Sequence, residues 1–534
     1  MEKLSGFREK DYLEQVTLLY EIDKAKDTAA LPELMDLFMN PTRDQAVDRM
    51  VVNALHAILA TSPQATIEGL ASPHPGVRTL CVQVSGESRF PEATPALLKL
   101  IETETDQDFV YEVLTALSRI KTPEGLPSFR KHMTSEEPYI STLCVSMLGT
   151  YKDAESVPAL VAMLNDSDSD TRYEQCDLST WEVVKALAAI GTDEALASIT
   201  AKLRHRNPTV RRIITDCLTA MGERPIPFLA QAFAQKAADT AAVDQQTLAA
   251  NVLGFIGHKK GADVLVAAID RGVVEHANVK YAVYEALGRI GSMKGVICLM
   301  DGLDESDELI LMAVVTALDR HVNPGILKNL TGRLAARGPV ADQLARAVAS
   351  ARALNIFTGL YADPAMAEIL VNAVCLSKDP VVVEAFREAL SALGTDQAKA
   401  HAAKLPDVTA KAGAKKAIAA DDSKSMLALY RNILTDLGVT PLTATNGQEA
   451  VDHLDQGEVP DLVITDMNMP VMDGMELTNK IRSTPGLEAV PIIMVTTESE
   501  GSQREMAAKA GVTDFLTKPF KPAQLAELVR KYLG

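Results

Sequence analysis

A repeated sequence unit of about 31–32 residues constrains the fold of this chain more than any other feature. Residues 79–100 (TLCVQVSGESRFPEATPALLKL) and 142–163 (TLCVSMLGTYKDAESVPALVAM) align without a gap at an offset of 63. A related stretch, TALSRIKTPEGLPSF, lies midway between them. Apolar residues three and four positions apart predict that each unit is a helix, a short turn and a second helix. Because one helix pair cannot bury its apolar face alone, the pairs must stack into an α-solenoid.

Two kinds of residue mark the repeat. We expect a small residue to close the first helix of each unit, at Gly86, Ser118, Gly149, Ala188, Gly222, Gly254, Gly288 and Gly394. We expect a proline to open the second helix in several units, at Pro95, Pro127, Pro158 and Pro227. Proline is tolerated in the first helical turn because an N–H there has no helical partner.

The repeat pattern resembles the short HEAT-like repeats of phycobilisome-lyase-type proteins and many bacterial scaffolds. This resemblance covers roughly residues 10–405, and we assign residues 1–405 to one HEAT-like α-solenoid. The pattern is least regular at both ends and between residues 339 and 379.

The charge of the chain argues against nucleic-acid binding. The formal net charge is −18, and residues 417–534 carry 17 acidic and 10 basic residues, so residues 1–416 are acidic too. DNA and RNA phosphates require basic surfaces. One basic stretch, residues 202–212 (KLRHRNPTVRR), is interpreted as a solvent-exposed corner between helices rather than a phosphate-binding patch.

Composition also bears on location. The longest apolar run, residues 309–318, is too short to span a bilayer, and the charged N-terminus lacks the apolar core of a signal peptide. We expect a cytoplasmic protein without membrane insertion.

The six cysteines, at positions 81, 144, 176, 217, 298 and 375, form no C-x-x-C pair and are predicted to be buried, reduced thiols.

The pattern changes after residue 405. Residues 406–416 are rich in Lys and Ala and lack periodicity, which predicts a linker. Short β-rich runs then alternate with amphipathic helical segments, which predicts a parallel sheet with helices on both faces. The predicted strands are residues 417–420, 440–445, 462–465, 492–496 and 514–517.

Polar side chains follow the predicted strands. Asp421 and Asp422 end the first, Asp466 the third, Thr496 the fourth, and Lys518 follows the fifth. Because functional groups gather at the carboxyl ends of parallel strands, we expect these side chains to converge. Three neighbouring carboxylates repel one another unless a divalent cation lies between them, and a hard, oxygen-liganded ion such as Mg²⁺ is the natural partner.

These motifs identify residues 417–534 as a receiver domain of the bacterial two-component response regulator family. The DDS at 421–423, the DMNMPVMDG at 466–474, the TT at 496–497 and the KPF at 518–520 all match the family pattern. The resemblance implies a doubly wound, flavodoxin-like (βα)5 fold. The whole chain is therefore expected to be multidomain, an all-α solenoid followed by an α/β domain.

The resemblance also implies a role for each matching residue. Asp466 would accept a phosphoryl group from a histidine kinase or phosphotransfer protein, and Lys518 would contact the acyl phosphate. Thr496 would turn toward the phosphoryl group and Phe515, the switch aromatic, would follow it inward. Mg²⁺ would be held by Asp421, Asp422, Asp466 and the backbone carbonyl of Asn468.

Two further positions bear on how long the phosphoryl group lasts. Asn468 lies two residues after Asp466 and Glu498 two residues after Thr496. In the family these positions flank the path of the water that attacks the acyl phosphate. The pairing of Asn with Glu is seen in chemotaxis-type receivers and implies a short lifetime, although both residues are also compatible with a plain solvated loop.

The sequence favours a signalling scaffold, in which phosphorylation of the receiver controls the proteins that the receiver or the solenoid binds. No enzymatic activity is expected beyond the receiver's own phosphotransfer and autodephosphorylation. Two alternatives stay open. One is a phosphate sink that the solenoid localises, and the other is a HEAT-repeat enzyme, such as a lyase, that the receiver regulates. None of the nine histidines is followed by Glu, so the His-Glu ligands of HEAT-like metal hydroxylases are missing.

Overall fold

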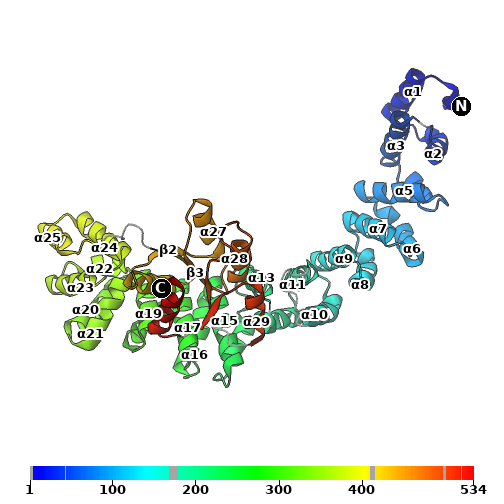
Figure 1. The fold of residues 1–534 in the computed structure, drawn as a ribbon. Coiled ribbons are helices and arrows are strands. Elements are labelled where there is room, and N and C mark those ends of the chain that lie inside the picture. Colours follow the sequence, from blue (N-terminus) through cyan, green and yellow to red (C-terminus); the bar gives the residue numbers. More distant parts are fainter. Residues whose placement is uncertain are drawn as a thin grey trace. The chain divides into compact units, whose positions relative to one another are not determined.

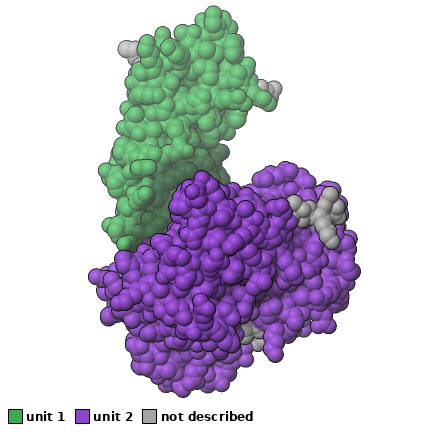
Figure 2. Space-filling model, turned by 90° about the vertical axis from the view of Figure 1, so that its left-hand side faces the viewer, with its two compact units in different colours: residues 1–165, 177–195 green, residues 166–176, 196–534 purple. Residues whose placement is uncertain are grey.

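The computed structural model describes residues 4–42, 44–166, 178–205, 207–408, 415–496, 501–518 and 520–534. The chain divides into two compact units, residues 1–165 with 177–195 and residues 166–176 with 196–534 (Figure 2). This division does not fall at the predicted linker, because the C-terminal α/β part shares one unit with the second half of the repeats. The predicted domain limits of 1–405, 406–416 and 417–534 stay a prediction.

Helices make up the described part of the chain up to residue 408 (Figure 1). The first helices of successive pairs are α1 (Tyr12–Ala25), α3 (Gln45–Leu59), α5 (Pro75–Glu87), α7 (Gln107–Ile120), α9 (Pro138–Thr150), α11 (Leu178–Ile190), α13 (Pro208–Ala220), α15 (Thr240–Ile256), α17 (Ala277–Ile290), α19 (Glu308–Asp319), α21 (Pro339–Ser350) and α23 (Pro364–Cys375). The helices between and after them are α2 (Leu31–Met39), α4 (Pro63–Leu70), α6 (Thr94–Thr103), α8 (Leu126–His132), α10 (Val157–Asp166), α12 (Asp193–Ala201), α14 (Ile226–Leu229), α16 (Lys259–Asp270), α18 (Met293–Asp301), α20 (Pro324–Ala335), α22 (Leu354–Leu360), α24 (Pro380–Leu393) and α25 (Asp396–Lys404).

Within each unit, the first helix of one pair packs against the first helix of the next pair. Within the first unit this row runs from α1 through α3, α5, α7 and α9 to α11, and within the second unit from α13 through α15, α17, α19 and α21 to α23. The predicted α-solenoid is confirmed. The four expected prolines all occupy the second position of a helix, in α6, α8, α10 and α14.

The small residues of the repeat have a different role from the expected one. Most lie inside the last turn of their helix rather than closing it, as Gly288 does in α17. A Cβ atom on Gly288 would lie 2.9 Å from the Cα atom of Ala317 in α19, closer than real Cβ contacts come. Close approach of neighbouring first helices therefore explains the glycine. The same relation holds for three other pairs, with Cβ–Cα separations of 2.7–2.9 Å: Gly86 with Ala116, Gly149 with Ala186, and Gly254 with Ala286.

The C-terminal part is a five-stranded parallel sheet in the order β2-β1-β3-β4-β5. The strands are β1 (Lys416–Ala420), β2 (Thr440–Ala444), β3 (Leu462–Asp466), β4 (Ile492–Thr496) and β5 (Asp514–Thr517), each within one residue of its predicted limits. The helices are α26 (Lys424–Asp436), α27 (Gly447–Asp455), α28 (Gly474–Arg482), α29 (Gly501–Ala510) and α30 (Pro522–Leu533). The strand order reverses between β1 and β3, and in such sheets ligands bind beyond the carboxyl ends of strands at this point.

Apolar side chains cover both faces of the sheet. Residues of α26 and α30 pack on one face, with Tyr430 fully buried among them. Residues of α27 and α28, such as Leu477, pack on the other. Burial of these faces supplies most of the stabilising free energy of the sheet, because each large apolar side chain removed from water contributes roughly 1.5–3 kcal/mol.

The α/β part also packs against the solenoid within the second unit. Met312 of α19 is 2% exposed and belongs to the same apolar cluster as Met426 and Leu429 of α26. At the edge of this contact, Arg431 Nε donates to Asp379 Oδ2 at 2.6 Å, and both side chains are buried. Figure 1 shows the sheet beside the green helices α15, α17 and α19. The carboxyl edge of the sheet therefore faces repeats rather than open solvent alone.

Candidate functional site

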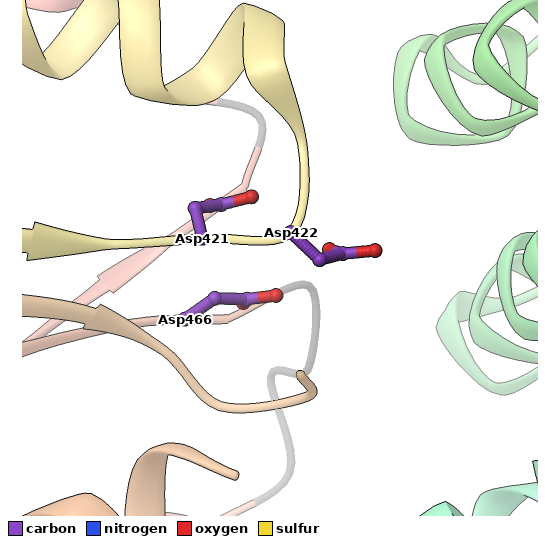
Figure 3. Close-up of side chains that lie close together, drawn as sticks. All are labelled: Asp421, Asp422 and Asp466. Carbon is purple, nitrogen blue, oxygen red and sulfur yellow. The ribbon is translucent and has the colours of Figure 1, made fainter. Parts of the chain in front are cut away.

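Three carboxylates meet at the carboxyl edge of the sheet, as the sequence predicts. Asp421 and Asp422 follow β1, and Asp466 is the last residue of β3. One oxygen from each side chain lies within 4.8 Å of the others. In Figure 3 the three side chains extend beyond the strand ends in the same direction, and the Asp422 carboxylate points toward the green helices.

A lysine bridges two of these carboxylates. Lys518 Nζ lies 2.8 Å from Asp421 Oδ2 and 3.2 Å from Asp466 Oδ1, and the Lys518 side chain is only 12% exposed. Tyr430 completes the arrangement from α26, since its hydroxyl donates to Asp421 Oδ2 at 3.0 Å. The expected convergence of Asp421, Asp422, Asp466 and Lys518 is thus present, with Tyr430 as a further member that the sequence analysis missed.

The loop after Asp466 is shaped by tight backbone contacts. A Cβ atom on Gly474 would lie 2.1 Å from the Asp466 carbonyl oxygen, so only glycine fits there. The Asp473 carboxylate caps α28 by accepting from the N–H groups of Met475 and Glu476, both at 2.9 Å. Val471 has a φ of 67°, an unfavourable conformation for a β-branched residue. These constraints fix the path of the backbone between Asp466 and the first residue of α28.

Burial and repulsion by neighbouring carboxylates raise the pKa of two of the acidic groups, Asp466 and Asp422. Desolvation raises the pKa of Asp466 to about 8, with Asp421 and Asp422 adding to the rise and Lys518 opposing it. Desolvation also raises the pKa of Asp422 to about 6, while Arg289 opposes the rise. Burial alone would lower the pKa of Lys518, but Asp421 and Asp466 raise it above its usual value. When Asp421, Asp422 and Asp466 are all ionised, their negative charge exceeds the positive charge of Lys518 and Arg289, which favours a further cation.

The remaining predicted residues lie around this centre. Thr496 ends β4, is 1% exposed, and its hydroxyl contacts Met467 Sδ at 3.9 Å. Phe515 of β5 is half-buried and packs against a cluster that contains Met467 and Met494. Glu498 lies outside the described residues.

Comparison with known proteins agrees with this geometry. The family profile "Response regulator receiver domain" matches residues 417–530. A chemotaxis protein CheY homolog of Campylobacter jejuni is 43% identical over 120 residues, which are 22% of this chain and 92% of that protein. The chain belongs to the response regulator receiver family.

Further similarities are found for the receiver and, separately, for the repeats. The receiver resembles chemotaxis protein CheY1 of Helicobacter pylori at 40% identity, covering 22% of this chain and 97% of that protein. The receiver domain of sensor histidine kinase PA1611 from Pseudomonas aeruginosa, solved with a magnesium ion in its active-site cleft, is 28% identical and covers 23% of this chain and 99% of that chain, with a TM-score of 0.22. A "HEAT repeats" profile matches residues 63–142.

Arg211 and Arg212, which end the basic stretch at residues 202–212, do not lie at a solvent-exposed corner, so that interpretation was wrong for them. Arg211 is 2% exposed, and its Nε donates to Asn468 Oδ1 of the receiver at 3.1 Å. Its neighbour Arg212 forms an ion pair with Glu476 of α28, with Nη2 3.1 Å from Oε1. Glu476 of the receiver therefore supplies a counter-charge for Arg212, and Asn468 a neutral acceptor for Arg211.

Helix α17 contributes three more side chains next to the site. Arg289 Nη2 lies 3.0 Å from Asp422 Oδ2, and Asn278 Nδ2 donates to the Lys518 carbonyl at 2.7 Å. Tyr281 forms a hydrogen bond with Ser423, the residue that caps α26. Local sequence patterns contain no signal for these contacts, because each joins residues more than 130 positions apart.

A small cavity of about 60 Å³ remains between the receiver site and the repeats. Its lining includes Asp421, Asp422, Asp466 and Lys518 from the receiver, and Asn278 from α17. Since a water molecule needs about 10–15 Å³ by this measure, the cavity has room for roughly four molecules of that size. Among the described residues, no helix is both long and apolar enough to cross a membrane.

Proposed function

We propose that the protein is a response regulator in which Asp466 accepts a phosphoryl group from a sensor histidine kinase or a phosphotransfer protein. The observation that carries the proposal is the Lys518 ammonium group, which lies between Asp421 and Asp466 at 2.8 and 3.2 Å. In the reaction, an Asp466 carboxylate oxygen forms a bond to phosphorus while the P–N bond to the donor histidine breaks. Lys518 offsets charge on the transferred phosphoryl oxygens, so the protein acts mainly by positioning and electrostatics.

The donor set of the site fits Mg²⁺. Asp421, Asp422 and Asp466 supply hard oxygen ligands within 4.8 Å of one another, and the backbone carbonyl of Asn468 would add a fourth. The bound ion would neutralise the carboxylates and the incoming phosphoryl oxygens. The raised pKa values of Asp422 and Asp466, which have burial as their first cause, support a site that is incomplete without a cation.

Phosphorylation would be transmitted through β4 and β5. Thr496 would turn from Met467 toward the phosphoryl group, and the half-buried Phe515 would move into the space that this leaves. Asn468 and Glu498 would flank the water that hydrolyses the acyl phosphate. Two receiver conformers that differ in this way are the physical basis of a population shift.

The output would be protein binding. The HEAT-like solenoid of residues 1–405, joined to the receiver at 417–534 by the segment 406–416, would act as a scaffold for a protein partner. Neither part has the basic charge that nucleic acid requires, since residues 417–534 carry −7 and the rest −11.

Labelling with acetyl phosphate tests the proposal. With Mg²⁺ present, the full chain is expected to take up one phosphoryl group, and Asp466→Asn is expected to take up none because an amide is not a nucleophile here. Intact-protein mass spectrometry measures the addition. Labelling of the Asp466→Asn variant at another residue, or none in the wild type, would contradict the assignment.

A further inference from the structure

The solenoid covers the phosphorylation site with a polar and charged surface. This surface, here called the docking face, is formed by side chains of α13 and α17. Its residues that contact the receiver are Thr209, Arg211, Arg212, Asn278, Tyr281, Glu285 and Arg289. Their receiver partners cluster around the metal ligands and the adjoining loops.

Arg289 holds a position that matters for cation binding. Its Nη2 lies 3.0 Å from Asp422 Oδ2, an oxygen on one of the proposed metal ligands. The guanidinium also lies 4.5 Å from the ring centre of Phe255 and 3.6 Å from Glu285, and these contacts orient it. Arg289 therefore occupies the charge-compensating role at Asp422 that a divalent ion would fill.

The docking face also limits which molecules reach Asp466. The cavity beside Asp466 has room for only roughly four water-sized molecules. A protein that presents a phosphohistidine would have to displace α17, because Asn278 hydrogen-bonds to Lys518 and Tyr281 to Ser423 on either side of the site. The docked arrangement thus admits an ion or a small anion and excludes a protein donor.

The interface is built so that it can open. Arg289 Nη1 and Arg212 Nε are both buried and lack a hydrogen-bond partner among the described residues. A buried donor without a partner is unfavourable, because it has lost its hydrogen bonds to water. These two arginines regain hydrogen bonds to water when the faces separate, which lowers the free energy of opening.

We infer that the docking face is an intramolecular partner of the phosphorylation site and competes with Mg²⁺ for Asp422. This inference rests on the proposed function, since it assumes that the three carboxylates bind Mg²⁺. By linkage, a docked solenoid weakens Mg²⁺ binding, and bound Mg²⁺ weakens docking by the same factor. Binding of Mg²⁺ and phosphorylation of the receiver would then release the solenoid surface of α13 and α17 for a protein partner.

Mg²⁺ titration of the full chain tests the competition, with isothermal titration calorimetry as the measurement. Arg289→Ala removes the competing cation directly. Arg212→Glu and Glu476→Arg each place like charges opposite one another, away from the metal ligands, and the double variant restores an ion pair in reverse. Arg333→Ala is the matched control, because Arg333 pairs with Asp304 inside the repeats.

We expect Arg289→Ala and both single charge reversals to bind Mg²⁺ at least roughly fivefold more tightly than the wild type, the low end of typical couplings. The double reversal should return to the wild-type affinity, and Arg333→Ala should not differ from it. Rescue by the double reversal identifies docking, rather than loss of one arginine, as the cause.

Hydrogen exchange gives an independent readout. Addition of Mg²⁺ and beryllofluoride, a phosphoryl mimic, to the wild type should speed amide exchange in α13 and α17 but not in α5 or α7. Equal Mg²⁺ affinities across all variants, with unchanged exchange, would overturn the competition while leaving the proposed function intact. No Mg²⁺ binding in any variant would instead overturn the proposed function and this inference with it.

Discussion

Arg211 of the solenoid donates its Nε to Asn468 Oδ1 at 3.1 Å, although 257 positions separate the two residues. Asn468 lies two positions after Asp466, on the loop that borders the proposed phosphorylation site. Its side chain is therefore not a plain solvated loop residue. An amide held in this way can orient neighbouring polar groups, including a water molecule, near Asp466.

The contact bears on the lifetime of the phosphorylated state. We predict that Asn468→Lys combined with Glu498→Arg slows loss of the phosphoryl group, because bulky basic side chains block the path of the attacking water. Decay of phosphoryl label after removal of acetyl phosphate measures the lifetime. Equal decay rates in the wild type and the double variant would mean that these side chains do not control it.

The close helix contacts of the solenoid give a prediction for stability. Gly288→Ala would place a methyl group 2.9 Å from Ala317 Cα, and such overpacking costs about 1–3 kcal/mol. Gly332→Ala in α20 is the matched control, since a Cβ atom there meets nothing within 4 Å. We expect the control to stabilise by about 0.5–1 kcal/mol, because alanine favours a helix over glycine.

Urea unfolding of the full chain, followed by circular dichroism, measures both effects. A Gly288→Ala variant that is as stable as Gly332→Ala would show that neighbouring helices separate at no cost. The close approach of α17 and α19 would then not explain the glycine.

Local patterns predicted the receiver well for a physical reason. A parallel sheet requires buried β-rich runs, and the ends of its strands must meet at one edge, so Asp421, Asp466 and Lys518 could be placed together from sequence alone. Tyr430 was not predicted as a site residue, because a tyrosine in an apolar helix pattern is typical of the hydrophobic core. In the structure Tyr430 is a core residue and also donates a hydrogen bond to Asp421.

The docking face could not be predicted in the same way. Arg289 and Arg211 lie on helices where charged residues usually face solvent, and their partners are 133 and 257 positions away. The repeat pattern fixes which side of each helix is apolar, but it does not say which polar surface meets another domain. Likewise the repeat pattern marks Gly86 and Gly288 as recurring small residues, but glycine is required there because of the close neighbouring helix.

Buried thiols give a prediction for chemical reactivity. Burial raises the pKa of Cys81 and Cys144 to about 12, and both side chains are fully buried. Because the thiolate is the reactive form, we expect iodoacetamide at pH 8.5 to leave both unmodified in the folded protein. Peptide mapping by mass spectrometry detects the modification, with the half-buried Cys375 and a denatured sample as references. Modification of Cys81 as fast as of Cys375 would contradict the prediction.

The last prediction concerns pH and Mg²⁺ together. The pKa values of Asp466 and Asp422, about 8 and about 6, lie above the usual value near 4 of an unfolded aspartate. Between pH 4 and pH 8 the folded protein therefore holds protons that the unfolded chain has already released. Without Mg²⁺, the free energy of unfolding of this region should fall as pH rises through that window, because stability decreases wherever the folded state binds more protons.

Mg²⁺ should counteract this loss, since the proposed site would bind it through the deprotonated carboxylates. At 100 times its dissociation constant a ligand stabilises by about 2.7 kcal/mol, so the melting temperature should rise by several degrees at pH 8 and by less at pH 5, where protons compete. Asp422→Ala should lose most of the shift at pH 8. Differential scanning fluorimetry across this pH range makes the measurement, with Ca²⁺-free and chelator-treated samples as baselines. A Mg²⁺ shift that is equal at pH 5 and pH 8 would mean that Asp422 and Asp466 are already ionised at pH 5, contrary to the burial that raises their pKa values.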